Sequence, residues 1–388
     1  MPTATTRSIV PVPHAQPVPT LHLALDLGNA TWKLAFGTSL AHPPRLRATP
    51  ARDLTQLDAE IAAAKARFGL PLDAPVVVCY EAGRDGFWLQ RALRARGLTC
   101  LVVDSASIPE NRRKRRPKSD RLDAAALLRL LLRHLAGERD VWSVVRVPSV
   151  DDEDRRHLHR ELFTLTRERT RQINRIKGLL ALHGVALPRL RGLPASPPAL
   201  YDWAGAPLPP GLTARLTREW ARLRTTQREL LALRAARRRQ LASAEAATDP
   251  TLQMVERLLA LRGIGEVSAW LYTTEFFGWR QFRNRRQVGG LAGLTATPRE
   301  SGDTHQELGI SKAGNVRIRG LAIELAWSWV RRQPASALTR WYRRRFTGSA
   351  RQRRIGIVAV ARKLLIALWR YLETGVLPEG AALKSRPA

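Results

Sequence analysis

Strand signals in this chain are concentrated in its first 150 residues, and this boundary constrains the fold more than any other feature. From Leu21 to about Val150, apolar runs typical of strands (LHLALDL, TWKLAFG, APVVVCYEA and CLVVDS) alternate with segments that have the pattern of helices. We expect helices near Asp53–Phe68, near Phe87–Arg96 and from about Asp120. Alternation of this kind predicts an α/β sheet domain.

From about Asp151 to Pro250 the apolar residues recur at helical spacing instead. Two apolar seams are separated by the Pro/Gly-rich stretch 188–211. This pattern predicts two long amphipathic helices that pair like a coiled coil, either within one chain or between chains. The first seam contains Leu158, Leu162, Leu165, Ile173, Ile176 and Leu180, and the second contains Leu212, Leu216, Trp220, Leu223 and Leu230.

The remainder of the chain is again expected to be mostly helical, and no repeat of fixed period is present. The predicted organisation therefore has five parts. These are a disordered leader over residues 1–20, the α/β domain over 21–150, the coiled-coil helical region over 151–250, a mostly α domain over 251–375 and a tail over 376–388.

The charge of the chain points to a polyanionic partner. Its 65 Lys and Arg residues against 33 Asp and Glu residues give a net charge of +32, far above the roughly 2–8 that solubility needs. Nucleic acid is the obvious partner. Cys79 and Cys100 lie in or beside apolar runs, which favours buried thiols and a reducing cytoplasm. Within the cytoplasm we expect the protein to associate with the nucleoid. No apolar run reaches the roughly 18 residues of a membrane span.

Four acidic residues form the sharpest motif in the first domain. Asp26 and Glu81 end predicted strands, where open α/β sheets place their ligands. In KSDRLDAAALLRLLL, Asp120 and Asp123 are three residues apart and share one face of the helix that they open. Four converging acids predict divalent metal, Mg²⁺ or Mn²⁺, although a helix cap and a first-turn dipole partner would also explain the second pair. The cations directly upstream fit a phosphate backbone: Arg112, Arg113, Lys114, Arg115 and Arg116.

Two segments of the C-terminal domain also suggest contact with nucleic acid. LLALRGIGEVSAWLY predicts a helix-hairpin-helix-like element in which Gly263 and Gly265 let backbone N–H groups approach a phosphate, although plain helix packing gives the same pattern. Further along, a polar loop is expected to carry Ser301. A serine in such a loop is usually a turn former, and His305 and Ser311 are equally open candidates for chemistry on these grounds. Three cations follow the loop: Lys312, Arg317 and Arg319.

Taken together, these motifs resemble the insertion-sequence 110 family of transposases, in the branch that joins a DEDD domain to a serine-bearing transposase domain. LDLGNATWKLA, CYEAGRDGFWLQRAL, KSDRLDAAAL, LRGIGEVSA and GLTATPRESG…ISKAGN appear in family order. The resemblance implies a RuvC/RNase H-like fold whose four metal-binding positions are Asp26, Glu81, Asp120 and Asp123, and it places the nucleophile at Ser301 rather than Ser311. It also implies donor and target DNA, a structured guide RNA, and a dimer or tetramer in which the acids of one protomer act with the serine of another.

A phosphoserine link would conserve the bond energy of the cleaved strand, which suits recombination. Three alternatives remain open. A Holliday-junction-type nuclease would use the same acids to activate water. An actin-like ATPase would share the first phosphate loop, which ALDLGNATWKLAFG resembles, but would need later motifs that are missing. A non-enzymatic nucleic-acid scaffold would leave the four acids unexplained.

Overall fold

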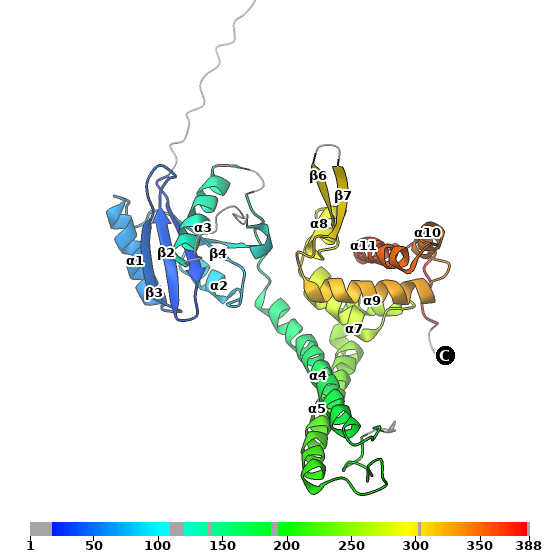
Figure 1. Cartoon of the computed structure of the whole chain (residues 1–388). Coiled ribbons are helices and arrows are strands. Elements are labelled where there is room, and N and C mark those ends of the chain that lie inside the picture. Colours follow the sequence, from blue (N-terminus) through cyan, green and yellow to red (C-terminus); the bar gives the residue numbers. More distant parts are fainter. Residues whose placement is uncertain (1–17, 109–119, 139–140, 188–192, 302–303, 386–388) are drawn as a thin grey trace, which may run out of the picture. The chain divides into compact units, whose positions relative to one another are not determined.

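The first part of the chain forms a five-stranded sheet that mixes antiparallel and parallel pairs (Figure 1). The computed structural model describes residues 18–108, 120–138, 141–187, 193–301 and 304–385. The strand order is β3-β2-β1-β4-β5: β1, β2 and β3 pair antiparallel, whereas β4 is parallel to both β1 and β5. The strands are β1 (Leu21–Leu27), β2 (Thr31–Gly37), β3 (Arg45–Pro50), β4 (Val76–Glu81) and β5 (Thr99–Val103).

Alternate side chains of the sheet enter two different cores. Leu23 and Val78 belong to a core shared with α1 (Leu54–Arg67) and α2 (Trp88–Ala95). Ala24 and Cys79, the next residue on each strand, belong to a core shared with α3 (Asp120–Leu135). Helices therefore pack on both faces of the sheet, and the predicted α/β class is confirmed.

Both cysteines are buried and free, as the sequence predicted. Burial raises the pKa of the Cys100 thiol to about 12, and it also raises that of Cys79. Neither thiol is therefore available as a thiolate at neutral pH.

Strand β3 was not predicted from the sequence, because RLRATP lacks a run of apolar residues. It is an edge strand that pairs only with β2, and most of its side chains are at least partly exposed. Arg45 forms an ion pair of 2.9 Å with Glu60 of α1. Charge suits an edge strand, since it discourages pairing with another sheet.

Two long helices, α4 (Val150–Ala181) and α5 (Pro210–Ala242), begin the second part of the chain and pack against each other (Figure 1). Ser149 begins α4 with a capping box, because its hydroxyl accepts from the Asp152 N–H at 3.0 Å and the Asp152 carboxylate accepts from the Ser149 N–H. Residues of both predicted seams meet in two small cores; coiled-coil supercoiling itself remains a prediction. These cores contain Ile176, Leu180, Leu216, Trp220 and Leu223, and Leu162, Leu165 and Leu230.

The remaining helices enclose the largest core among the described residues, and Trp329 of α9 is fully buried in it. The helices are α6 (Pro250–Ala260), α7 (Glu266–Leu271), the π-helical segment η3 (Tyr272–Phe277), α8 (Arg285–Leu291), α9 (Val316–Arg332), α10 (Ala337–Arg345) and α11 (Ala350–Thr374). Two short 3₁₀ turns, η1 (Ser105–Ser107) and η2 (Ala244–Ala247), lie in connecting segments. A helical C-terminal region is therefore confirmed, with one strand hairpin that was not expected.

Contacts divide the chain into two compact units, Met1–Val147 and Pro148–Ala388. The second unit holds both the paired helices and the C-terminal helices. Across the described residues, every helix is either too short or too polar to cross a membrane.

Candidate functional site

Asp26 and Glu81 occupy adjacent positions at the carboxyl ends of the two central strands. Leu25 of β1 is in register with Tyr80 of β4, and the two acids are the next residue on each strand. Side chains alternate along a strand, so Asp26 points to the same face as Ala24, and Glu81 to the same face as Cys79. That face is the one covered by α3.

Helix α3 brings a further acid to this face. Its Leu127 and Leu128 are buried in the core beneath the helix, which contacts β1, β2 and β4. Asp120 is the first residue of α3, and Asp123 lies one turn later and is half-buried. The helix that carries Asp123 thus covers the face to which Asp26 and Glu81 point.

The described acidic side chains do not by themselves form a metal-binding group. No three side chains from His, Cys, Asp and Glu in that set are placed so that they could hold a metal ion together, and the set does not include the side chain of Asp120. The donor type nevertheless fits, because carboxylate oxygens on one face are the ligands that Mg²⁺ prefers. The four-acid site therefore remains a prediction.

Asp104 is a further acid at this edge of the sheet that was not predicted from the sequence, and side-chain alternation after Val103, which lies in the α3-side core, turns it to the face opposite Asp26 and Glu81. It directly follows β5, which is parallel to β4, so it lies at the same edge of the sheet as Glu81. Its backbone N–H donates to the Ser143 carbonyl at 2.9 Å, and its own carbonyl accepts from the Ser107 hydroxyl at 2.7 Å. An acid immediately after an apolar strand, the pattern that indicated Asp26, would have identified it.

Ser301 is the last residue of strand β6 (Ala296–Ser301), which pairs antiparallel with β7 (Thr304–Ile310) and is in register there with Thr304. The prediction of a polar loop at this point was wrong. Polar residues make up four of the six residues of β6 and four of the seven of β7, so the apolar alternation that normally reveals strands is weak. Ser311 lies just beyond β7, where its N–H donates to the Thr295 carbonyl at 2.8 Å.

The segment after β7 is packed tightly against the end of α8. Gly314, with a φ of +87°, approaches so closely that a Cβ there would lie 2.2 Å from the Leu291 carbonyl oxygen. Asn315 then caps α9 by accepting from the N–H groups of Arg317 and Ile318. Arg319 donates to the Lys312 carbonyl at 2.8 Å, which fixes the shape of this segment.

The Gly-Ile-Gly element joins α6 to α7 as the sequence suggested. Gly263 has a φ of +92°, and its carbonyl accepts from the Ser328 hydroxyl at 2.9 Å. Gly265 caps α7, and Lys384 donates to the Ile264 carbonyl at 2.8 Å. A cavity of about 460 Å³ lies beside these residues. The predicted phosphate contact at Gly263 and Gly265 stays a prediction.

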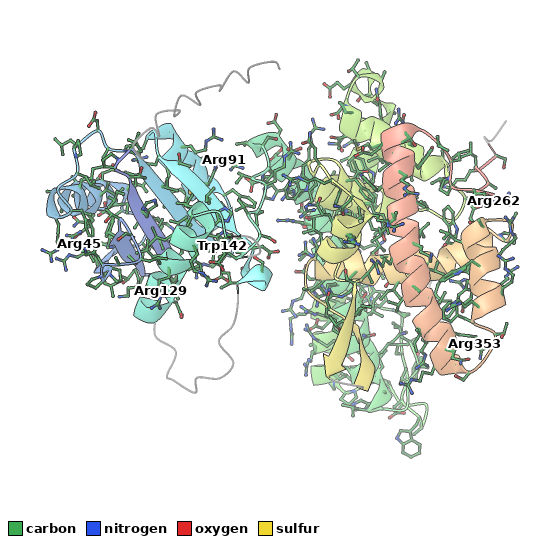
Figure 2. All side chains as sticks on the ribbon, turned by 90° about the horizontal axis from the view of Figure 1, so that it is seen from above. Arg45, Arg91, Arg129, Trp142, Arg262 and Arg353 are labelled. Carbon is green, nitrogen blue, oxygen red and sulfur yellow. The ribbon has the colours of Figure 1, made fainter. Side chains whose placement is uncertain are left out.

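Cationic side chains are spread over both units, and Figure 2 labels Arg45, Arg91 and Arg129 in the first and Arg262 and Arg353 in the second. The predicted phosphate-binding run from Arg112 to Arg116 lies outside the described residues. The run Arg343–Arg345, in the last turn of α10, is exposed.

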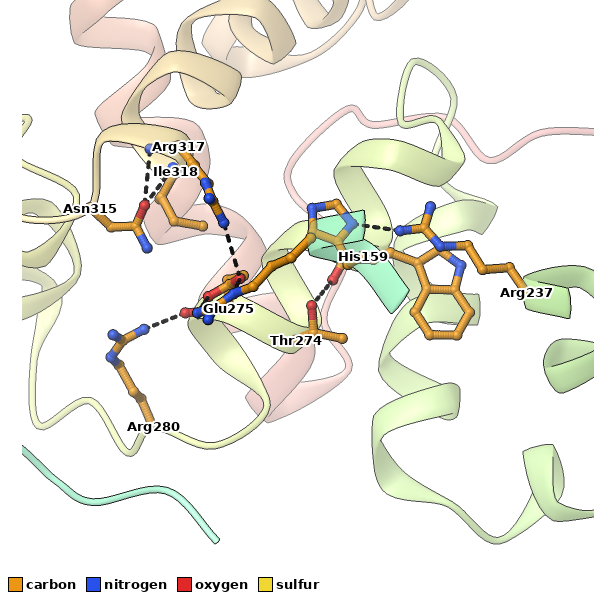
Figure 3. Close-up of polar contacts among 10 residues, drawn as sticks. His159, Arg237, Thr274, Glu275, Arg280, Asn315, Arg317 and Ile318 are labelled. Atoms are coloured by element: carbon orange, nitrogen blue, oxygen red, sulfur yellow. Dashed lines mark hydrogen bonds and ion pairs between the residues drawn. The ribbon is translucent and has the colours of Figure 1, made fainter. Parts of the chain in front are cut away.

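A buried polar cluster that the sequence did not reveal joins the paired helices to the C-terminal helices (Figure 3). Glu275 of η3, 4% exposed, accepts two hydrogen bonds from Arg160 of α4 at 2.6 and 3.0 Å, and Arg317 of α9 lies 3.8 Å away. Burial raises the pKa of Glu275, but the hydrogen bond and charge of Arg160 outweigh it and hold that pKa below its usual range. Arg317, predicted to bind nucleic acid, therefore also has a partner inside the protein.

His159 forms the second half of this cluster. It is 3% exposed, and its Nδ1 accepts from the Arg237 guanidinium, which itself lies over the ring of Trp270 (Figure 3). Burial, followed by the charge of Arg237, lowers the pKa of His159 to about 4. The imidazole is therefore neutral at pH 7.

The stability of the second unit should consequently fall with acidification between about pH 6.5 and pH 4. Over that window the unfolded chain protonates His159 and the folded chain does not, so the free energy of unfolding should decrease by up to about 3 kcal/mol. His159→Asn keeps a hydrogen-bond acceptor but does not titrate. Urea unfolding at pH 7 and pH 4.5 should show a smaller loss for this variant than for the wild type, and equal losses would contradict the assignment.

Comparison with known proteins identifies the class to which this fold and these motifs belong. Residues 255–341 match a family model described as transposase of the IS116/IS110/IS902 family, and residues 47–184 match a DEDD transposase model. The two ranges contain Ser301 and the acids from Glu81 onward, but Asp26 lies before them. The chain is therefore a DNA transposase, and the DEDD domain indicates dependence on a divalent metal.

Full-length relatives narrow this to a family. The chain is 40% identical over 382 residues to y4rJ of Sinorhizobium fredii, a protein named as a transposase. The match spans 94% of this chain and 95% of the relative. The chain is also 26% identical over 258 residues to the transposase for insertion sequence element IS1328 of Yersinia enterocolitica, across 65% of this chain and 71% of that relative. This chain belongs to the IS116/IS110/IS902 family of transposases.

Proposed function

We propose that this transposase exchanges DNA strands through a covalent link between DNA and Ser301. The observation that carries the proposal is the position of Ser301, at the end of β6 and inside the matched C-terminal transposase region. Denaturing gels of a reaction on donor and target DNA would test the proposal by revealing a protein–DNA adduct.

The strand order and the acids support a RuvC/RNase H-like fold for the first unit. Three antiparallel strands continued by two parallel ones, with α3 across one face, bring Asp26, Glu81 and Asp123 to one side of the sheet. We assign these acids, together with Asp120, to holding Mg²⁺. When bound, the metal supplies positive charge that stabilises the phosphoryl group being transferred.

The chemistry balances without an external energy source. The Ser301 hydroxyl oxygen attacks phosphorus, its proton passes to a carboxylate, and the bond from phosphorus to the 3′ oxygen breaks as that oxygen takes up a proton. A 3′ hydroxyl of a second strand then attacks the phosphoserine, which restores a phosphodiester and releases the serine. The number of phosphate ester bonds is unchanged, so ATP is not needed.

Four finer features belong to the same proposal. The paired helices α4 and α5 act as a coiled coil, the Gly-Ile-Gly element acts as a helix-hairpin-helix, and a structured RNA guides the choice of DNA. A dimer or tetramer lets the acids of one protomer act with the serine of another. The excess of positive charge supports a nucleic-acid partner but does not distinguish RNA from DNA.

Phosphate contacts should dominate the affinity for DNA. Neutralised phosphates release counterions, so binding should weaken by about 10³-fold or more between 50 and 200 mM salt if six or more phosphates are contacted. Replacing the exposed run Arg343–Arg345 with glutamine should lower the slope of log affinity against log salt, whereas Arg96→Gln, on the surface of the first unit, should leave it unchanged. A flat dependence in the wild type would contradict the proposal.

A further inference from the structure

Near the end of α4, the described residues include a group of large aromatic and apolar side chains that are exposed to solvent. Trp203, in the segment between α4 and α5, is 83% exposed, whereas Trp327, also among the exposed large apolar side chains, is 39% exposed. Tyr201, two residues before Trp203, is 58% exposed, and Leu182, the residue before His183 at the end of α4, is 81% exposed. An exposed group of this kind is unusual, since a tryptophan side chain that has no binding partner is normally buried against the core.

The backbone beneath Trp203 is fixed, although its ring is free. The Trp203 N–H donates to the His183 carbonyl at 3.2 Å, which anchors the segment to the end of α4. Asp202 Oδ1 accepts from the N–H groups of Ala204 and Ala206 at 2.9 and 2.8 Å. Gly184 has a φ of +71°, and a Cβ there would lie 2.9 Å from the Trp203 Cβ. These contacts therefore hold the backbone of Trp203 at a defined position, from which the indole projects into solvent.

The paired helices around this segment are strongly cationic. Over the described residues 171–187 and 193–225, the only acids are Asp202, which closes the turn, and Glu219, which is buried and paired with Arg175 and Arg222. All seven cations of these ranges are exposed: Arg171, Arg175, Lys177, Arg215, Arg218, Arg222 and Arg224. Charge of one sign beside exposed aromatic rings fits a nucleic acid better than a protein surface.

We propose that Trp203, assisted by Tyr201, stacks on an unpaired base of single-stranded nucleic acid whose phosphates lie along the cations of α4 and α5. A duplex hides the faces of its bases, so the contact selects unpaired segments. This inference extends the function beyond strand exchange and does not depend on Ser301.

The test uses the full-length protein with fluorescent 12-nucleotide probes: single-stranded DNA, single-stranded RNA and a DNA duplex. Trp203→Ala should weaken binding of a single strand by about 5- to 150-fold, the range for loss of one stacking aromatic, and change duplex binding less than about 2-fold. Trp203→Phe should retain most of the affinity. A loss of affinity confined to the RNA probe or to the DNA probe would identify which of the two single strands binds at Trp203.

Two controls distinguish base stacking from a general apolar contact. Leu182→Ala removes a neighbouring exposed apolar group without a ring and should leave single-strand affinity unchanged. A probe containing 5-iodouridine should cross-link to the peptide that contains Trp203. The proposal would be overturned if Trp203→Ala caused equal losses of affinity for single strand and duplex, or no loss at all. It would also be overturned if both Trp203→Ala and Leu182→Ala changed the sedimentation of the protein while probe binding stayed unchanged, because that result would indicate a protein interface.

Discussion

Replacing Ser301 with alanine is expected to lower strand exchange by at least about 10³-fold, because removal of a nucleophile eliminates the covalent path. Only one oxygen is lost, and the residue lies at the end of a strand, so the hairpin of β6 and β7 should still form. Recombination of supplied donor and target DNA, with any RNA that copurifies with the protein, measures the effect. DNA affinity should stay within about 2-fold of the wild type.

Ser311→Ala is the matched control for this experiment. Ser311 is ten residues further along, and it is held through its backbone N–H, which the substitution leaves in place. Its exchange activity should therefore remain within a few-fold of the wild type. Robust exchange by Ser301→Ala, with loss of exchange in Ser311→Ala, would show that the nucleophile has been assigned to the wrong serine.

Asp123→Asn is expected to reduce strand exchange by about 10²-fold or more, since an amide cannot replace a carboxylate as a metal ligand or proton acceptor. Excess chelator should abolish wild-type exchange, and added Mg²⁺ or Mn²⁺ should restore it. Because the proposal places acids and serine of one reaction on different protomers, mixing Asp123→Asn with Ser301→Ala should recover part of the activity.

Asp58→Asn is the corresponding control in the same unit. Asp58 is an exposed acid whose partner is Arg96, at 3.2 Å, and surface pairs of this kind contribute little to stability. Its exchange activity should be close to that of the wild type. Undiminished exchange by Asp123→Asn, or exchange in excess chelator, would contradict a role for the acids in holding metal.

The fold of the first unit could be predicted because its strands are apolar and its helices separate them. These local patterns could not predict that β1 and β4 are neighbours in the sheet, and this pairing places Asp26 beside Glu81. Strand β3 and the hairpin of β6 and β7 were missed for one reason. None of them contains a run of apolar residues, since their apolar side chains are interrupted by polar or charged ones, and local patterns give too weak a strand signal there.

The polar cluster around Glu275 illustrates a second limit. Arg160 and Glu275 are 115 residues apart in sequence, and both are ordinary members of helical segments. No local pattern marks a carboxylate that will be buried and paired, because burial is decided by the packing of α4 against η3. The acids Asp120 and Asp123 could be identified as a pair because they lie within one turn of the same helix.

The most direct measurement of the central claim is the mass of the peptide that becomes attached to DNA. Wild-type protein would be incubated with donor and target DNA, any RNA that copurifies with it, and Mg²⁺, then quenched in denaturant and digested with protease and nuclease. A nucleotide joined through phosphate to Ser301 is the predicted result. An adduct on Ser311, or cleaved DNA with a water-derived end and no adduct, would contradict it, and the second outcome would favour a nuclease that uses the same acids.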